Sequence, residues 1–230
     1  MKYNNIDLKG QETFFQIAKG YNDMHIKLLE LDPKRRDAVL NAALKEFAVK
    51  GFDDASTNII AKEAGISKAL MFHYVNNKKD LFLFTYNYFA DLMDKEYFAL
   101  LNFSEKDIFN RLRQSYLLQI GLIKRYPWIF EFNKLSAATH SDEINKALEA
   151  RTHNKQISCF HHLFDEIDES SFREGLEIEK SKQILLWANI GFTNQILDDI
   201  RHSNAWELDY ESILEKLNGY IEELRKIFYK

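Results

Sequence analysis

The stretch Ile60–Val75, IAKEAGISKALMFHYV, constrains the fold of this chain more than any other part of its sequence. Gly65 interrupts a helical pattern there, and Ala61 lies four residues earlier, where a small side chain lets a second helix approach. Glycine readily takes the positive φ that a tight turn needs, and Ser67 is a good N-cap for a following helix. The spacing therefore predicts two short helices joined by a tight turn, a helix-turn-helix.

The neighbouring residues favour DNA binding over a plain helix hairpin with an aromatic core, which remains the alternative. Residues 34–80 contain nine Lys/Arg against six Asp/Glu, whereas the whole chain has a net charge of −4. A small basic segment is thus attached to an acidic body. With the apolar positions turned inward, the third helix presents an outer face that fits the major groove, made of Lys68, Ala69, Phe72 and His73.

Turn-forming residues are scarce, with 2 prolines and 8 glycines in 230 residues, and no alternating strand pattern is found. The sequence therefore predicts an all-α fold. Asp32-Pro33 is a helix-start signal and Gly51 a helix end. Helices are predicted at about 33–50, 57–64, 68–75, 78–101, 104–125, 128–138, 142–167, 178–201 and 210–228, with an extra helix within residues 1–31.

Three motifs follow one another between residues 43 and 78. The first, A-x-x-x-F-x-x-x-G-[FY], fits Ala43 through Phe52, and the second, [ST]-T-x-x-I-A-x-x-A-G-[VI]-S, fits Ser56 through Ser67. The third, a [FY]-x-[HY]-F-x-[NS]-K run, is matched at Phe72, Tyr74, Asn77 and Lys78. Residues 34–84 thereby resemble the DNA-binding domain of TetR (tetracycline-repressor) family regulators. Ala69 stands where that family often has glycine, and Val75 where it usually has phenylalanine.

The resemblance implies particular roles for these residues. Phosphate contacts fall on Thr57, Tyr74 and Lys78, base reading falls on Lys68, Ala69 and Phe72, and Asn58, Leu70 and His73 flank them. It also implies a three-helix helix-turn-helix domain (32–80) followed by a C-terminal helical ligand-binding and dimerisation domain (81–230). An apolar face within residues 1–31 predicts an N-terminal extra helix or arm before them.

The acidic body is rich in aromatic residues, since 13 of the 18 phenylalanines lie beyond residue 80. Aromatic-lined cavities suit flat or lipophilic ligands, although any one of these residues can simply be core. An apolar or aromatic effector is therefore expected between the fourth helix (78–101) and residues 142–167. The candidate ligand residues are Tyr97, Phe103, Tyr116, Trp128, Phe132, His161 and Trp187.

The last two helices carry apolar stripes that are expected to form a homodimer interface. The alternative is that a stripe covers the chain's own core. The candidate interface residues are Ile184, Ala188, Gly191, Gln195, Tyr210, Ile213, Leu214, Leu217, Ile221, Leu224 and Phe228.

Several functions find no support in the sequence. The longest uncharged run, Gln183–Leu197, has 15 residues and is too short to span a bilayer. No secretory signal is seen, and a single cysteine, Cys159, fits a reducing, cytoplasmic setting. Cys159, His161 and His162 do not share one helix face, so no metal is expected. No nucleophile–base pair or phosphate-binding glycine loop argues for an enzyme or a cofactor.

The sequence thus predicts a ligand-responsive transcriptional repressor that binds a palindromic DNA operator as a homodimer and is released by its effector. The alternative is a DNA-bound nucleoid or division-associated protein whose C-terminal body binds protein partners. An apolar cavity beside the fourth helix would favour the repressor. A filled core with an exposed apolar patch would favour the alternative.

Overall fold

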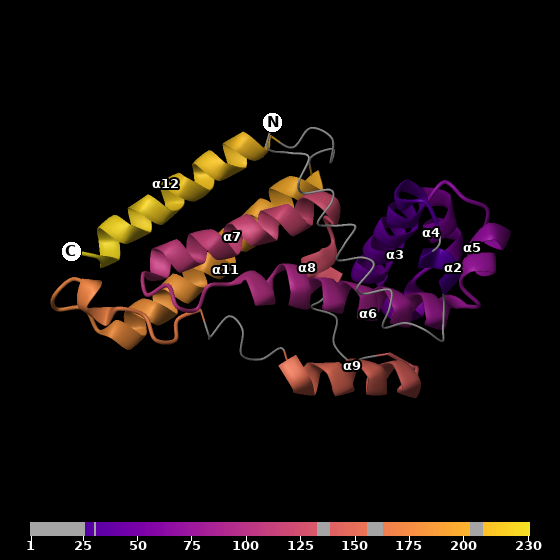
Figure 1. Cartoon of the computed structure of the whole chain (residues 1–230), viewed down its shortest axis with the longest axis horizontal. Coiled ribbons are helices and arrows are strands. Elements are labelled where there is room, and N and C mark those ends of the chain that lie inside the picture. Colours follow the sequence, from indigo (N-terminus) through magenta and orange to yellow (C-terminus); the bar gives the residue numbers. More distant parts are fainter. Residues whose placement is uncertain (1–25, 30, 133–138, 156–162, 203–208) are drawn as a thin grey trace. The chain divides into compact units, whose positions relative to one another are not determined.

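A computed structural model describes residues 26–29, 31–132, 139–155, 163–202 and 209–230 of the chain. These residues form helices and no strand, which confirms the predicted all-α class (Figure 1). Extended backbone pairs only as an isolated antiparallel bridge between Phe172 and Tyr229 in this part of the chain. The chain divides into two compact units, one from residues 1–99 with 128–154 and one from residues 100–127 with 155–230.

The first unit contains the helices that precede and surround the predicted helix-turn-helix. They are α2 (Ile26–Leu29), α3 (Pro33–Asp54), α4 (Thr57–Glu63), α5 (Lys68–Tyr74), α6 (Lys78–Glu96), the 3-10 turn η1 (Phe98–Leu100), α8 (Ile129–Phe132) and α9 (Asp142–Lys155). Asp32 caps α3 by accepting from the N–H of Arg35 at 3.1 Å, as the Asp32-Pro33 signal predicts. Gly51, at φ 68°, breaks the helical geometry of α3 near its end.

Aromatic rings fill the centre of the first unit. The ring of Phe82, on α6, lies 5.0 Å from that of Phe47 and 5.9 Å from that of Phe132. Phe132 also meets Tyr86 and Phe89, and all five side chains are buried. The resulting core holds α3, α6 and α8 together, and gives the helix-turn-helix a rigid support.

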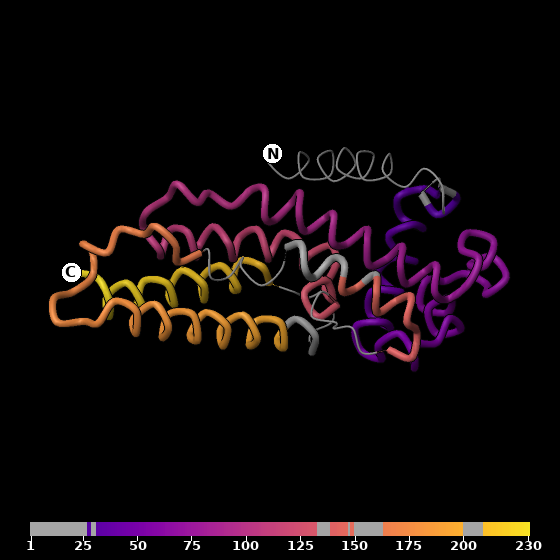
Figure 2. The backbone as a smooth tube through the Cα atoms, turned by 90° about the horizontal axis from the view of Figure 1, so that it is seen from below, coloured from indigo at the N-terminus to yellow at the C-terminus, as the bar shows by residue number. Residues whose placement is uncertain are grey.

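The second unit is built from α7 (Ile108–Arg125), the 3-10 turn η2 (Glu169–Ser171), α11 (Ile178–His202) and α12 (Tyr210–Phe228). Helix α12 packs against both α7 and α11 (Figures 1 and 2). Its apolar stripe is turned inward, with Ile213, Leu217, Ile221, Leu224 and Phe228 buried within the chain. Within the described residues, no helix combines the length and apolar character that crossing a bilayer requires.

A buried arginine joins two loops of the second unit. The side chain of Arg111 is fully buried, and its guanidinium donates to the carbonyls of Phe103, Leu163 and Asp165 at 2.7–3.0 Å. It also donates to the carbonyl of Glu105. Burial lowers the pKa of Arg111, and the ring of carbonyl acceptors compensates for the desolvated charge.

Three predicted helix ends are wrong. The predicted 104–125 helix begins only at Ile108, because Asp107 caps it by accepting from Phe109 and Asn110 N–H groups at 2.8 and 3.1 Å. Helix α6 ends at Glu96 rather than near 101. Residues 163–166 form turns, with Glu166 at φ 51°, instead of the end of a 142–167 helix. The predicted helical face within residues 1–25 lies outside the described residues.

Candidate nucleic-acid interface

The turn between α4 and α5 is fixed by backbone hydrogen bonds. The N–H of Gly65 donates to the carbonyl of Lys62 at 3.1 Å, and the N–H of Ile66 donates to that of Ala61 at 3.0 Å. With Gly65 at φ 68°, these two bonds make a Schellman motif, which ends α4 and turns the chain sharply. Ser67 then caps α5 by accepting from Leu70 N–H at 3.1 Å. The predicted helix-turn-helix is therefore present.

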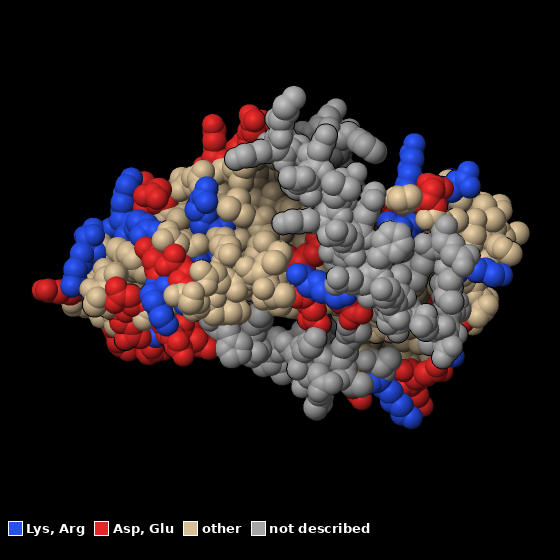
Figure 3. Space-filling view, in the orientation of Figure 1, with Lys and Arg blue, Asp and Glu red and all other residues tan. Residues whose placement is uncertain are grey.

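The two faces of this element differ in burial. Ile60, Ala61, Met71 and Val75 point into the core, at 0–2% exposure. On α5, the side chains of Lys68, Ala69, Leu70 and His73 are exposed, and Asn58 is exposed on α4. The face that the sequence assigns to the major groove is thus open to solvent. In Figure 3, Lys and Arg side chains stand out from the surface around α4 and α5, at the right of the view.

Aromatic side chains support this exposed face. The ammonium of Lys68 lies 5.8 Å from the centre of the Phe72 ring, and Phe72 is partly buried. The partly buried ring of Tyr74 meets the exposed ring of His73 edge to face at 5.7 Å. The Phe72 ring is therefore placed to stabilise the Lys68 ammonium by a cation–π contact.

The corner between α3 and α4, residues 51–57, sets where α4 begins. Ser56 caps α4 by accepting from Ile59 N–H at 3.4 Å, and its own N–H donates to the buried carboxylate of Glu46 at 2.8 Å. Thr57 follows as the first helical residue and is partly exposed. Its position at the start of α4 is the one predicted for a phosphate contact.

Lys78, which the sequence predicts to contact a phosphate, makes contacts within its own unit. Its ammonium donates to the carbonyls of Asp53 and Ala55, at 2.9 and 3.1 Å, and lies 4.8 Å from the centre of the Phe52 ring. Two of its three N–H groups are thus used to join the start of α6 to the corner. Sequence reasoning missed this contact because it joins residues 23–25 positions apart.

The described candidate ligand residues are divided between the two units. Phe132 and Tyr97 are core residues of the first unit, and Trp128 is partly exposed in the same unit. In the second unit, Phe103 and Trp187 are 39% and 62% exposed. His161 lies outside the described residues, as do Cys159 and His162.

Tyr116 does line a small cavity, between α7, α11 and α12. The cavity has room for about one water molecule and lies entirely within the second unit, not between α6 and residues 142–167 as predicted. Besides Tyr116, its lining includes Gln119, Phe192, Thr193 and Leu217.

The candidate dimer residues divide into two groups. Five of the α12 candidates are buried in the chain's own core: Ile213, Leu217, Ile221, Leu224 and Phe228. The expectation that these five meet a second copy is therefore corrected. Tyr210 and Leu214, also on α12, are partly buried. On α11, Ile184, Gly191 and Gln195 are exposed and Ala188 is partly exposed. Trp187 and Ile190 extend this exposed face, at 62% and 46% exposure.

Comparison with known proteins agrees with this architecture. Residues 39–83 match the sequence model for bacterial regulatory proteins of the tetR family. The chain is 36% identical over 73 residues to the HTH-type transcriptional regulator YuxN of Bacillus subtilis, covering 32% of this chain and 24% of YuxN. It is 39% identical over 57 residues to the HTH-type transcriptional regulator BetI of Brucella canis, covering 25% of this chain and 29% of BetI. The alignments thus span about a quarter of each relative.

Solved structures show likeness over most of the chain. A TetR family transcriptional regulator from Chloroflexus aurantiacus aligns with a TM-score of 0.57 at 18% identity, covering 88% of this chain and 97% of that one. The ketosteroid transcriptional regulator KstR2 of Mycobacterium tuberculosis aligns with a TM-score of 0.57 at 16% identity, covering 87% and 97%. Both likenesses concern the fold. The helix-turn-helix segment, residues 39–83, is therefore similar to the tetR family of bacterial regulatory proteins, and the rest of the chain resembles solved regulators of that family in fold.

Proposed function

We propose that this protein is a transcriptional repressor that binds a palindromic operator as a homodimer and is released by a small apolar or aromatic effector. The observation that carries the DNA-binding part is the open face of α5, where Lys68, Ala69, Leu70 and His73 are exposed on a helix whose other face is buried. A short helix with one rigidly supported face and one exposed face that carries both polar and methyl groups fits the B-DNA major groove.

The exposed side chains of α5 suggest how bases are read. The Lys68 ammonium can donate to O6 and N7 of guanine, and the methyl groups of Ala69 and Leu70 can contact thymine methyl groups. We propose that the hydroxyl of Thr57, at the start of α4, and that of Tyr74, at the end of α5, contact phosphates of the operator. Ala69 removes the extra backbone freedom of the glycine often found there in relatives, and adds a methyl group to the contacting surface.

Homodimerisation is proposed at the exposed face of α11 alone. Residues 183–197 carry no charged side chain, and the face formed by Ile184, Trp187, Ile190 and Gly191 is open in the single chain. The exposed face of α12, in contrast, is charged, with Glu211, Glu215, Lys216, Glu222 and Glu223. An exposed apolar stripe is typical of an interface, and two-fold pairing of α11 would be self-complementary.

The effector site is proposed at the cavity between α7, α11 and α12. Its lining combines aromatic rings, Tyr116 and Phe192, with the polar side chains of Gln119 and Thr193, which is the composition of small-molecule sites. The cavity has room for about one water, so an effector would have to separate the helices as it binds. A panel of aromatic and acyl compounds, screened by the shift in the unfolding temperature of the second unit, tests this site.

The alternative, a DNA-bound protein that uses its body to hold protein partners, draws support from the same α11 face and from the filled aromatic core around α6. The proposed repressor and this alternative differ in what binds the exposed face of α11. A homodimer that buries Trp187 in solution favours the repressor. A monomer whose α11 face stays accessible favours the alternative.

Selection of DNA sequences from a random pool, with the purified protein as bait, tests the proposed function. We expect enrichment of an inverted repeat, whose half-sites lie about one helical turn or a little more apart. The Lys68→Ala protein should lose enrichment at one position of each half-site. A protein that binds all sequences equally, or none, would refute sequence-specific operator recognition.

A further inference from the structure

We propose that residues 139–143, at the start of α9, form a strap that positions the α3–α4 corner (residues 51–57) for DNA binding. The strap lies outside the helix-turn-helix in the sequence and carries none of the predicted DNA-contacting residues. This inference rests on the proposed function, because it assigns positioning residues to the DNA-binding site proposed above.

Two charged contacts join the strap to the DNA-binding element. The carboxylate of Asp53, in the corner, accepts a hydrogen bond from the main-chain N–H of His140 at 3.0 Å and lies 3.2 Å from its Nδ1. The ammonium of Lys79, in the first turn of α6, meets the carboxylate of Glu143 at 2.7 Å. Glu143 thus raises the pKa of Lys79. The contacts join residues 87 and 64 positions apart within one compact unit.

The strap is itself ordered by local hydrogen bonds. Thr139 N–H donates to the Asn145 side chain at 3.0 Å, and the Asn145 amide donates back to the Thr139 carbonyl at 2.8 Å. Ser141 N–H donates to the Thr139 hydroxyl at 3.1 Å. Helix α9 is anchored in the core through Ile144 and Leu148, which are 0% and 1% exposed. The strap therefore ties the corner to a fixed helix rather than to a loose loop.

The corner is held from both sides. The main-chain carbonyl of Asp53 accepts from Lys78, while its carboxylate accepts from the strap. Three residues after Asp53, Ser56 caps α4, and Thr57 begins that helix. Because the strap already holds the corner in one conformation, DNA binding loses less entropy in ordering the corner. Asp53 therefore couples the position of α9 to that of the DNA-contacting start of α4.

The direction in which DNA affinity changes when Asp53 and Glu143 are removed distinguishes a positioning role from a purely electrostatic one. Asp53 and Glu143 are acidic side chains near a surface that binds a polyanion. If they acted only through charge, removing them would strengthen DNA binding and would release Lys79 to attract phosphates. If they position the corner, removing them weakens binding although the protein becomes more basic.

The test compares two variants with equal charge. Asp53→Ala/Glu143→Ala removes both strap contacts. Asp54→Ala/Glu149→Ala removes one exposed acid from the same corner and one from the same helix, and leaves both strap contacts in place. Affinity for the selected operator should fall about threefold to tenfold in the first variant, as expected for the loss of one exposed ion pair and one hydrogen bond to a carboxylate. It should stay level or rise in the second. If Asp53→Ala/Glu143→Ala binds the operator as tightly as the wild-type protein or more tightly, the proposed positioning role of the strap is wrong.

Hydrogen exchange gives a second readout that needs no DNA. Amides of residues 52–57 should exchange faster in Asp53→Ala/Glu143→Ala than in the wild-type protein, and at the wild-type rate in the control. Unchanged exchange in both variants overturns the proposal. A wild-type protein that selects no operator, but shows the faster exchange in the strap variant, would refute the proposed function while leaving the strap in place.

Discussion

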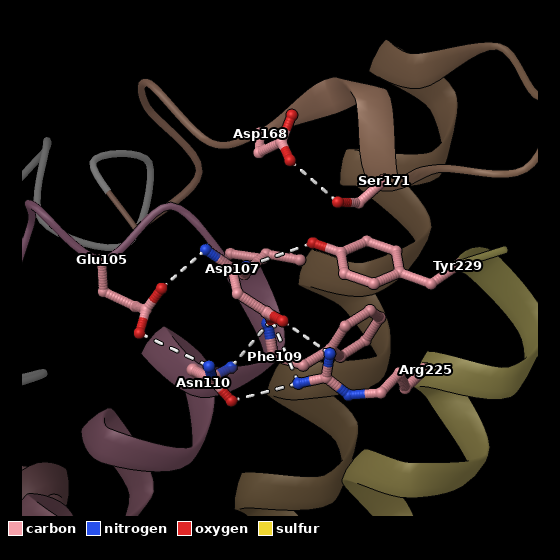
Figure 4. A network of polar contacts seen from close by, with 9 residues as sticks. Glu105, Asp107, Phe109, Asn110, Asp168, Ser171, Arg225 and Tyr229 are labelled. Carbon is pink, nitrogen blue, oxygen red and sulfur yellow. Dashed lines mark hydrogen bonds and ion pairs between the residues drawn. The ribbon is translucent and has the colours of Figure 1, made fainter.

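The guanidinium of Arg225, in the last turn of α12, pairs with both carboxylate oxygens of Asp107, the N-cap of α7, at 2.5 and 3.1 Å. Figure 4 shows the pair, with Asn110 accepting a third hydrogen bond from Arg225. The same guanidinium lies 5.2 Å from the Phe109 ring centre. One carboxylate therefore caps a helix and fixes the end of another, so α7 and α12 are joined by charge as well as by their apolar faces.

Replacing Asp107 by alanine should lower the free energy of unfolding by roughly 2–3 kcal/mol. About 1 kcal/mol comes from the lost cap, and the rest from leaving the partly buried Arg225 without its partner. Asp209→Ala is the matched control, because Asp209 caps α12 by accepting from Glu211 and Ser212 N–H groups. Urea unfolding measures both. Equal losses in the two variants would show that the ion pair contributes nothing.

Two tyrosines should make the protein less stable in alkali. Burial raises the pKa of Tyr220 and of Tyr229 to about 12. The folded protein therefore keeps protons that the unfolded chain gives up above pH 10, so stability is complete below pH 10 and falls as the pH rises towards 12. Unfolding by urea at pH 8 and at pH 11 measures this loss. Stability that stays level between these values contradicts it.

The two tyrosines should respond oppositely to replacement by phenylalanine at pH 8. The Tyr220 hydroxyl is buried and has no hydrogen-bond partner in the described part of the chain, while its ring stacks on Phe192 at 4.2 Å. Tyr220→Phe should therefore be neutral or stabilising by up to about 1 kcal/mol. Tyr229 accepts from the buried N–H of Ile108 at 3.3 Å, so Tyr229→Phe should cost about 1 kcal/mol. Losses of the same size would count against this assignment.

Local patterns predicted the elements that local chemistry decides. The cap at Asp32, the break at Gly65 and the cap at Ser67 all depend on residues within a few positions, and the structure confirms each. The apolar stripe of α12 was also found, but periodicity does not say which surface covers it. In the structure α12 covers its own chain's α7.

Long-range contacts were beyond the reach of the sequence. Lys78 donates to a carbonyl, and Asp53 accepts from His140, both far away along the chain. The acceptors around Arg111 are main-chain carbonyls, which no side-chain pattern reveals. The sequence likewise assigns Phe132 to a ligand site, because the sequence pattern around an aromatic residue is the same whether the residue lines a cavity or fills a core.

Lys78→Ala should destabilise the first unit by about 1–2 kcal/mol, since two hydrogen bonds from a charged group to the corner are lost. Binding to operator and to random DNA should weaken together through the misplaced corner, with little change in salt dependence. Lys62→Ala, an exposed lysine on α4, is the control and should change stability by less than about 0.5 kcal/mol. Unchanged stability with a salt slope reduced by about one unit would instead support the phosphate contact predicted for Lys78.

Lys68→Ala should cost roughly 1–3 kcal/mol in operator affinity and relax base preference at one position of each half-site. The reason is that Lys68 is exposed on the outer face of α5 and is held over the Phe72 ring. Titrations against the selected operator and against random DNA, at several salt concentrations, measure the effect. An equal loss on both DNAs would place Lys68 among the phosphate contacts instead.

Trp187→Glu should convert the proposed homodimer to a monomer without unfolding it. Trp187 is 62% exposed at the centre of an uncharged α11 face, so a charge there costs little in the single chain but would be buried without a partner in the dimer. Ile227→Glu is the matched control, because Ile227 is 58% exposed on α12, outside the proposed interface. Sedimentation equilibrium measures the mass, and circular dichroism checks folding.

The monomeric Trp187→Glu protein would bring only one recognition helix to each operator, so its affinity for the palindrome should fall with the loss of the second half-site. A Trp187→Glu protein that stays dimeric would show that α11 is not the interface, whereas a wild-type protein that is monomeric would favour another protein as the partner of this face.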